Sequence, residues 1–160
     1  MQTIRLYLDF DGVLHPDCAY RTGAGIELRR EGASLFQWAP LLIEALAPYP
    51  GVQLVLATSW VQVLGYDRAR GHLPELLRKR VAGATWHSSF DRAEWAAMSR
   101  YRQISRHVLR HETPRWLAID DDADGWSAEA GHRLVRCDPD LGLAEPGKID
   151  ELIGRIEQWA

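Results

Sequence analysis

Short apolar segments alternate with helix-like segments along the whole chain, and this alternation limits the folds that the sequence can adopt. The segment "VQLVLATSW" is nearly all apolar, which is typical of a parallel strand covered on both faces. Strands that alternate with helices predict right-handed crossovers and a mainly parallel sheet. The expected strands span residues 4–8, 52–60, 83–87, 115–120 and 132–138.

Apolar positions spaced three and four residues apart predict helices between these strands. Ser34 is a candidate cap for a helix over residues 35–49, and Pro40 is expected to kink the first turn of that helix. The predicted fold class is α/β, a three-layer Rossmann-like parallel sheet with helices on both faces. The other expected helices lie around residues 73–81, over residues 95–112 and over residues 146–160.

The length of the chain suits one folding unit. A chain of 160 residues has room for one sizeable core, and we expect a single domain over residues 1–160. Residues 16–34 carry glycines and charges without a helical period, which predicts a loop or small hairpin. This segment is the expected flap, and it leaves the domain with a minimal cap.

Composition excludes several classes of protein. The formal net charge of −3 provides no general basic field, which argues against a protein that coats nucleic acid. Cys18 and Cys137 cannot form a disulfide framework. The N-terminal segment is too short and too charged for a signal peptide, and no run approaches the roughly 18 apolar residues of a membrane span. We expect a cytoplasmic protein without a membrane partner, either a monomer or a homodimer.

Acidic and hydroxyl side chains follow three of the predicted strands. The carboxyl ends of parallel strands meet at one edge of a sheet, where sites form in such folds. Carboxylates packed this closely repel one another unless a cation neutralises them, and hard oxygen ligands favour Mg²⁺. The side chains in question are Asp9 and Asp11 after the first strand, Thr58 and Ser59 after the second, and Asp120, Asp121, Asp122 and Asp124 after the fourth.

This grouping suits phosphate chemistry. A carboxylate beside Mg²⁺ can attack phosphorus and form an aspartyl-phosphate. A second carboxylate, two residues further on, projects differently once the strand breaks at Gly12, and it can protonate the leaving oxygen. A hydroxyl on the neighbouring strand can bind the phosphoryl oxygens, and a cationic side chain is needed to balance the charge.

Three segments resemble the motifs of the haloacid dehalogenase (HAD) superfamily of phosphohydrolases: "YLDFDGVLH", "LVLATSW" and "WLAIDDD". They occur in order and span most of the chain. The resemblance implies that Asp9 is the nucleophile, that Asp11 is the general acid/base and that Thr58 binds phosphate, with Ser59 and Gly12 beside it. It also implies that Asp9, Asp121 and Asp120 bind Mg²⁺ together with the backbone carbonyl of Asp11.

The chain more narrowly resembles the small HAD domains found with "Swiss Army Knife" RNA-repair proteins. The segments that carry this likeness are "LDFDGVLHP", "LFQWAPLL", "LATSW" and "LAIDDDADGW". The likeness implies a substrate, the terminal phosphate of a nucleic acid, rather than a mechanism.

The cationic residue of the third HAD motif has three candidates in this chain. That motif is usually a lysine, sometimes an arginine, at a helix start upstream of the fourth strand. Lys79 lies early in the chain, whereas Arg100 and Arg102 lie near the start of the helix that precedes "RWLAID". We favour Arg100 and then Arg102, since arginine supplies both charge and a bidentate grip on phosphate.

The leading hypothesis is a Mg²⁺-dependent phosphatase that acts through Asp9. A minimal cap leaves an open cleft, which favours a nucleic-acid end, and a small phosphate ester is the alternative substrate. A non-catalytic phosphate-binding module on the same fold is the rival from another class. His15, Trp60 and Trp126 lie near the strand ends, where they either face the substrate or belong to the packed protein.

Overall fold

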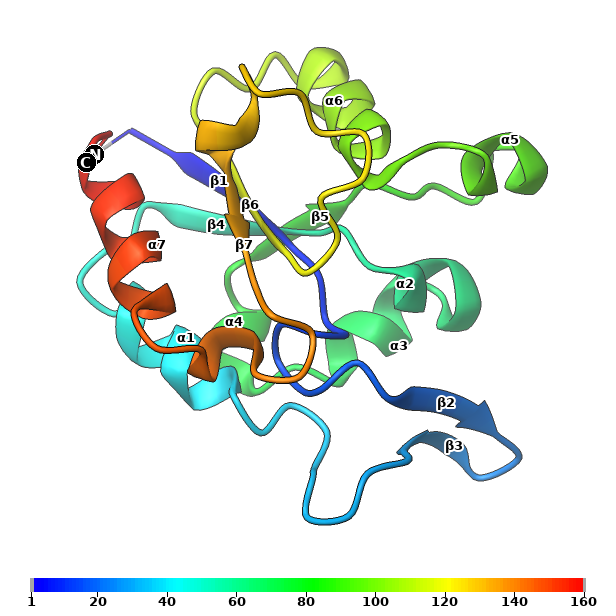
Figure 1. Ribbon diagram of the computed structural model, residues 1–160. Helices are drawn as coiled ribbons and strands as arrows, with labels where there is room; N and C mark the ends of the chain where they lie inside the picture. Colours follow the sequence, from blue (N-terminus) through cyan, green and yellow to red (C-terminus); the bar gives the residue numbers. More distant parts are fainter. Residues whose placement is uncertain (1, 160) are drawn as a thin grey trace.

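The computed structural model of the protein describes residues 2–159, and within them five parallel strands form one sheet in the order β5-β4-β1-β6-β7 (Figure 1). The first strand of the chain is therefore central, between β4 and β6, and the ends of these three strands lie side by side, as the sequence predicts. The α/β fold class with a parallel sheet is confirmed. The strands of the sheet are β1 (Ile4–Leu8), β4 (Val52–Leu56), β5 (Val81–Ala84), β6 (Trp116–Asp120) and β7 (Leu134–Arg136).

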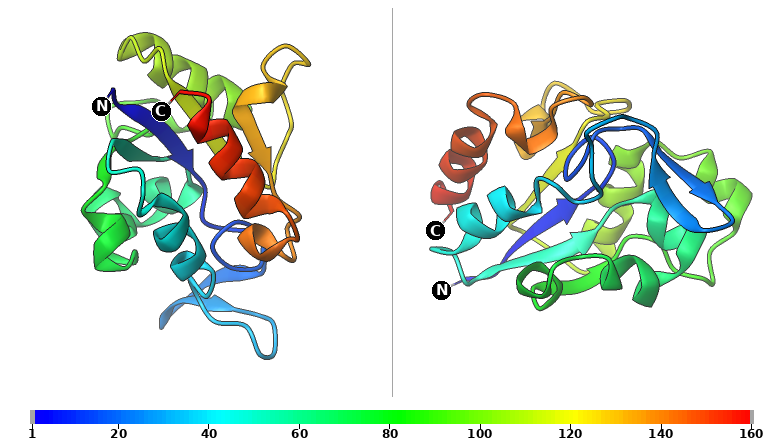
Figure 2. Two further views of the ribbon diagram at one scale, coloured as in Figure 1. Left: turned by 90° about the vertical axis from the view of Figure 1, so that its left-hand side faces the viewer. Right: turned by 90° about the horizontal axis from the view of Figure 1, so that it is seen from below.

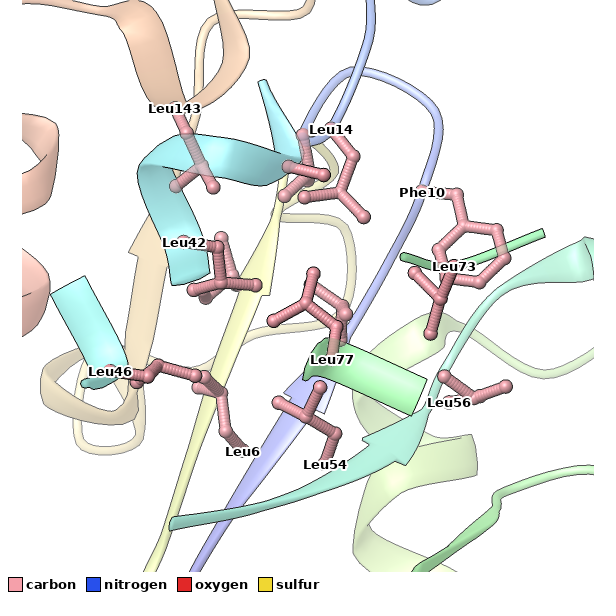
Figure 3. Close-up of a cluster of buried hydrophobic side chains, with 14 of the residues drawn as sticks. Leu6, Phe10, Leu14, Leu42, Leu46, Leu54, Leu56, Leu73, Leu77 and Leu143 are labelled. Carbon is pink, nitrogen blue, oxygen red and sulfur yellow. The ribbon is translucent and has the colours of Figure 1, made fainter. Parts of the chain in front are cut away.

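Helices cover both faces of the sheet (Figure 2). Leucines of α1, α4 and the sheet pack together in a core on one face, which α7 also covers, and Figure 3 shows this core at close range. On the opposite face, Ile104 of α6 packs among Tyr7, Val55 and Ala118 of the strands. The helices are α1 (Ala39–Leu46), α2 (Ser59–Leu64), α3 (Tyr66–Gly71), α4 (Glu75–Arg78), α5 (Arg92–Ala96), α6 (Arg100–Arg110) and α7 (Lys148–Glu157).

The segment of residues 16–34 contains an antiparallel hairpin, formed by β2 (Ala19–Thr22) and β3 (Gly25–Leu28). Figure 1 shows that the hairpin projects from the end of the sheet at which β1 ends. It is the small excursion that the glycines and charges of this segment predict, and it borders the carboxyl ends of the strands.

The first helix differs from its prediction. It begins at Ala39 rather than next to Ser34, because Phe36 has a left-handed backbone (φ 59°) that no helix continues through. Pro40 lies in the first turn of α1, where its missing N–H removes no helical hydrogen bond, so it starts the helix instead of kinking it.

The helix expected over residues 95–112 is in fact two helices, α5 and α6. The break lies at Ser99, whose hydroxyl accepts the N–H of Arg102 and caps α6. A serine that binds nearby backbone in this way competes with helix continuation. The break places Arg100 at the first position of α6.

Several other boundaries are shorter than predicted or shifted. The strand expected over residues 52–60 ends at Leu56, because Thr58 caps α2. The strand expected over residues 83–87 begins two residues earlier, at Val81, in register with Leu54 of β4. The last strand begins at Leu134, after a short 3-10 turn. Of the helix expected at 73–81, only Glu75–Arg78 is helical.

The helices within residues 2–159 are too short and too polar for any of them to cross a membrane.

A histidine of α6, His107, packs against Tyr7 of the sheet, and its protonation should control part of the stability of the protein. The Tyr7 hydroxyl lies 2.8 Å from Nδ1 of His107, and burial, together with the charges of His111 and Arg5, lowers the pKa of His107 from 6.5 to about 4. Between these pH values the unfolded chain binds a proton that the folded protein does not. The contribution of His107 to stability is therefore complete above pH 6.5 and is lost as the pH falls toward 4.

We predict that His107→Asn flattens the fall in unfolding free energy between pH 6.5 and 4, measured by urea denaturation at several pH values. The exposed His132 provides the control, since His132→Asn should leave the wild-type slope. Parallel curves for wild type and His107→Asn would contradict this assignment.

Candidate active site

A cavity of about 450 Å³ opens where the carboxyl ends of β1 and β6 lie next to the start of α2. It brings together most of the polar residues predicted from the strand ends. A larger cavity of about 580 Å³ lies elsewhere, beside β5 and α6, and no carboxylate lines it. The residues that line the smaller cavity are Asp9, Asp11, Asp17, Ser59, Arg100, Asp120, Asp121, Asp122 and Pro139.

Backbone hydrogen bonds hold the two most buried carboxylates in place. Asp9 follows β1 directly, and its Oδ1 accepts the N–H of Phe10 at 2.9 Å. Asp120 ends β6, and its Oδ1 accepts the N–H of Asp122 at 3.0 Å. Only 5% of Asp9 and 1% of Asp120 are exposed, so both carboxylates are held by the end of a rigid strand and away from bulk water.

Asp9, Asp120 and Asp121 form a cluster in which one oxygen of each lies within 4.8 Å of the others. Burial and the charge of Asp120 raise the pKa of Asp9 well above its usual value. Burial and the same neighbour raise the pKa of Asp121 to about 7. The cluster is therefore costly when fully ionised, and a bound cation would remove that cost.

The cluster fits a hard divalent cation. Its ligands are carboxylate oxygens, which such ions prefer. In addition, Oδ2 of Asp120 is buried and, among the described residues, has no hydrogen-bond partner. Asp9, Asp120 and Asp121 are thus the residues that could hold a metal.

Arg100 lies between two of these carboxylates. Its Nη2 is 3.8 Å from Oδ1 of Asp9, its Nε is 3.4 Å from Oδ2 of Asp120, and its Nη1 donates to the carbonyl of Ala57. Burial alone would lower the pKa of Arg100, but the charges of Asp9 and Asp120 outweigh it and raise the pKa. A permanent positive charge is therefore fixed beside Asp9, and it comes from the arginine that the sequence favours for this position.

The other two basic candidates lie away from the cavity. Arg102 is exposed and does not line the cavity, because two residues along a helix correspond to a rotation of about 200°. Of the two arginines considered for the third motif, the structure therefore places Arg100, and not Arg102, at the cavity. Lys79 is also exposed, and it pairs with Glu75 one turn earlier.

Asp11 is held by two aromatic donors. The indole Nε1–H of Trp60 lies 3.2 Å from Oδ1 and 3.0 Å from Oδ2, and Nε2 of His15 lies 2.8 Å from Oδ1. Its side chain remains 23% exposed and lines the cavity. It is separate from the cluster of three carboxylates, which agrees with a role for the backbone carbonyl, rather than the side chain, in metal binding.

Gly12 allows Asp121 to approach the end of β1. Its φ of +73° is in the left-handed region, and a Cβ at this position would overlap the carboxylate of Asp121. Gly12 contributes space and a turn rather than a ligand atom.

Thr58 and Ser59, the two hydroxyl residues of the second motif, have different positions: Thr58 caps α2, and Ser59 lines the cavity. Thr58 is 5% exposed, and its Oγ1 accepts the N–H of Trp60 at 3.2 Å, which makes it the cap of α2. Its own hydroxyl hydrogen is still available to a phosphoryl oxygen. Ser59 is exposed and lines the cavity, whereas Thr58 does not.

Sequence reasoning missed the contributions of three residues. Asp17, at the start of the flap, adds a carboxylate to the cavity. His15 and Trp60 are packed residues that hold Asp11, so Trp60, at 4% exposure, is not a platform for a base. The position of Asp17 directly after "DGVLHP" is a usable signal, whereas the hydrogen bonds of His15 and Trp60 depend on tertiary contacts.

Residues 5–147 match the family described as "HAD domain in Swiss Army Knife RNA repair proteins". The chain belongs to this family. Searches of curated proteins and of solved structures give no significant match. Membership in this HAD family agrees with the parallel sheet and supports a phosphatase-type hydrolase, with a buried acidic cluster that could bind a divalent metal.

We predict that Gly12→Ala weakens both folding and metal binding. The backbone strain should cost about 1–3 kcal/mol of unfolding free energy, and the displaced Asp121 should lower the affinity for Mg²⁺. Urea denaturation and isothermal titration calorimetry measure the two effects. Gly23→Ala is the matched control, since a Cβ at Gly23 contacts nothing and should change neither quantity. Wild-type Mg²⁺ affinity in Gly12→Ala would contradict the role given to this glycine.

Proposed function

We propose that this HAD domain is a Mg²⁺-dependent phosphatase that hydrolyses phosphomonoesters through an aspartyl-phosphate at Asp9. One observation carries the proposal: the buried carboxylate of Asp9 lies next to both a fixed cation, Arg100, and the carboxylates of Asp120 and Asp121. This arrangement supports a nucleophile that meets a phosphate dianion in a site able to balance its charge.

Asp9 would act in the first step. A carboxylate oxygen of Asp9 attacks phosphorus, and the bond from phosphorus to the leaving oxygen breaks as the new bond forms. The guanidinium of Arg100 beside Asp9 would bind the equatorial phosphoryl oxygens, and Ser59, at the start of α2, would bind them from the other wall of the cavity. Asp11, on the cavity wall, would protonate the leaving oxygen.

Asp11 would also act in the second step. After it has given its proton to the leaving group, its carboxylate can accept a proton from water as that water attacks the phosphorus of the acyl-phosphate. Phosphate is released and the carboxylate of Asp9 is restored. The same side chain therefore serves as acid and then as base.

The proposed metal is Mg²⁺, held by Asp9, Asp120, Asp121 and the carbonyl of Asp11. When bound, it would supply positive charge that neutralises the cluster and the phosphate. This choice of ion follows from the all-oxygen ligand set, since softer metals favour sulfur and nitrogen ligands.

The proposed substrate is the terminal phosphate of a nucleic acid. A smaller cavity of about 130 Å³ shares Asp11 and Ser59 with the 450 Å³ cavity and extends toward the hairpin, where Arg21 and Ile26 line it. A leaving group larger than a simple alcohol would lie there, with Arg21 available to a further phosphate of the chain. The description of the family as part of RNA-repair proteins supports the same substrate class.

We predict that Asp9→Asn abolishes turnover, because an amide cannot act as the nucleophile. The assay uses Mg²⁺ with p-nitrophenyl phosphate and then with oligoribonucleotides phosphorylated at the 3′ or the 5′ end. Asp124→Asn is the control and should retain wild-type rates, since Asp124 is exposed and does not line the cavity. Chelation of the metal with EDTA should stop the wild-type reaction, and Mg²⁺ should restore it.

Three results would contradict the proposal in whole or in part. No turnover of any phosphate ester by the wild type in Mg²⁺ would indicate the non-catalytic phosphate-binding module. Unchanged turnover in Asp9→Asn would remove the nucleophile that the proposal assigns. Turnover of small esters without turnover of either oligonucleotide would leave a phosphatase but would overturn the nucleic-acid substrate.

A further inference from the structure

The two ring nitrogens of His15 have different and fixed partners. Nδ1 lies 3.2 Å from the backbone N of Phe36, and a backbone N–H can only donate. Nδ1 must therefore be the unprotonated acceptor, and the neutral ring carries its proton on Nε2. That nitrogen lies 2.8 Å from Oδ1 of Asp11, so the ring donates to the carboxyl group.

From this geometry we propose that His15 is a positioning residue for Asp11: it is a permanent Nε2–H donor whose tautomer is set by Phe36. The inference deepens the proposed function, because it rests on Asp11 as the general acid and base of that reaction. His15 is fully buried, so water cannot compete for either nitrogen.

Phe36 adopts an unfavourable backbone conformation that supports this assignment. Its φ of 59° is in the left-handed region, which is strained for a bulky side chain. In this conformation its N–H binds His15, while its ring packs edge-on against Phe10 and His15 at centroid distances of 5.1 and 5.0 Å. A glycine would adopt the same backbone without strain but would provide no ring for this packing.

Trp60 holds Asp11 from another element. Its indole N–H is shared between both carboxyl oxygens, whereas His15 binds Oδ1 alone. Oδ1 thus receives two donors and Oδ2 only one. We therefore place the proton that Asp11 transfers on Oδ2, the oxygen with fewer donors. The hydrogen bond from His15 to Oδ1 is what makes the two oxygens different.

The same contact joins the two ends of the flap. His15 and Phe36 lie on either side of residues 16–35, so the bond from the Phe36 N–H to Nδ1 closes the base of the hairpin segment. The orientation of Asp11 and the path of the flap are therefore fixed by one buried ring.

Variants of His15 separate its two bonds. His15→Gln can place an amide N–H near the Nε2 position and should keep the donation to Asp11, whereas His15→Asn is too short to reach it. We expect kcat to fall about 10–100-fold in His15→Asn, a part of the usual contribution of a general acid, with little change in KM. His15→Gln should recover most of the loss. His72→Asn is the control, because His72 contacts Phe36 and Trp60 but not Asp11.

The leaving group distinguishes positioning from general damage to the fold. Proton donation matters more for an alkyl phosphate than for p-nitrophenyl phosphate, whose leaving group needs little protonation. The loss in His15→Asn should therefore be larger for the alkyl ester. An equal loss for both esters, or wild-type kcat in His15→Asn, would overturn the proposal.

Nitrogen NMR of the wild-type protein gives a readout that does not depend on activity. Spectra of the His15 ring should show the proton on Nε2 and none on Nδ1, and a proton on Nδ1 would overturn the inference. Absence of turnover in the wild type would instead be a failure of the proposed function, with the tautomer still measured.

Discussion

The guanidinium of Arg100 is the fixed charge on which the arrangement of the other groups depends. Asp9 and Asp120 end neighbouring strands and are almost fully buried, so burial raises the pKa of both carboxyl groups, and the charge of Asp120 raises the pKa of Asp9 further. Arg100 contacts both carboxylates and anchors itself on the carbonyl of Ala57. A cation at this point offsets the cost of burying two carboxylates side by side at the strand ends.

Three features of the fold position the carboxylates and Arg100: the order of the strands, the start of α6 and the turn at Gly12. Parallel pairing of β1 with β4 and β6 brings three strand ends together, and the two packed faces keep the strands rigid. The Ser99 cap starts α6 so that Arg100 is its first residue. Gly12 then turns the chain away and leaves room for Asp121. The acidic cluster is thus a product of sheet order, one helix start and one glycine.

The sequence predicted the parts of the site that depend on strand ends. Asp9, Asp120 and Asp121 follow apolar segments, and the position of their side chains requires only that these segments pair in parallel. The choice between Arg100 and Arg102 as the cation of the site depends on where α6 begins. Ser99 sets that start through a capping hydrogen bond, which the periodicity of the sequence does not reveal. Helix periodicity likewise gave no sign of the left-handed backbone at Phe36.

The hydrogen bonds that hold Asp11 could not be predicted from the sequence, because they depend on side-chain packing. The bonds from His15 and Trp60 to Asp11 join residues that are 4 and 49 positions away from it. Their direction depends on how an aromatic cluster packs, not on any local pattern. Both residues lie near the strand ends in the sequence, and only the packing distinguishes a side chain that holds Asp11 from one that faces the substrate.

Chemical trapping of the intermediate tests the central claim most directly. The wild-type protein would be quenched during turnover of a phosphate ester in Mg²⁺, reduced with borohydride and mapped by mass spectrometry. An acyl-phosphate at Asp9 would be reduced to homoserine at that position, only when both substrate and metal are present. A protein that turns over its substrate while Asp9 stays unmodified, or that carries the phosphoryl group on another residue, would contradict the account.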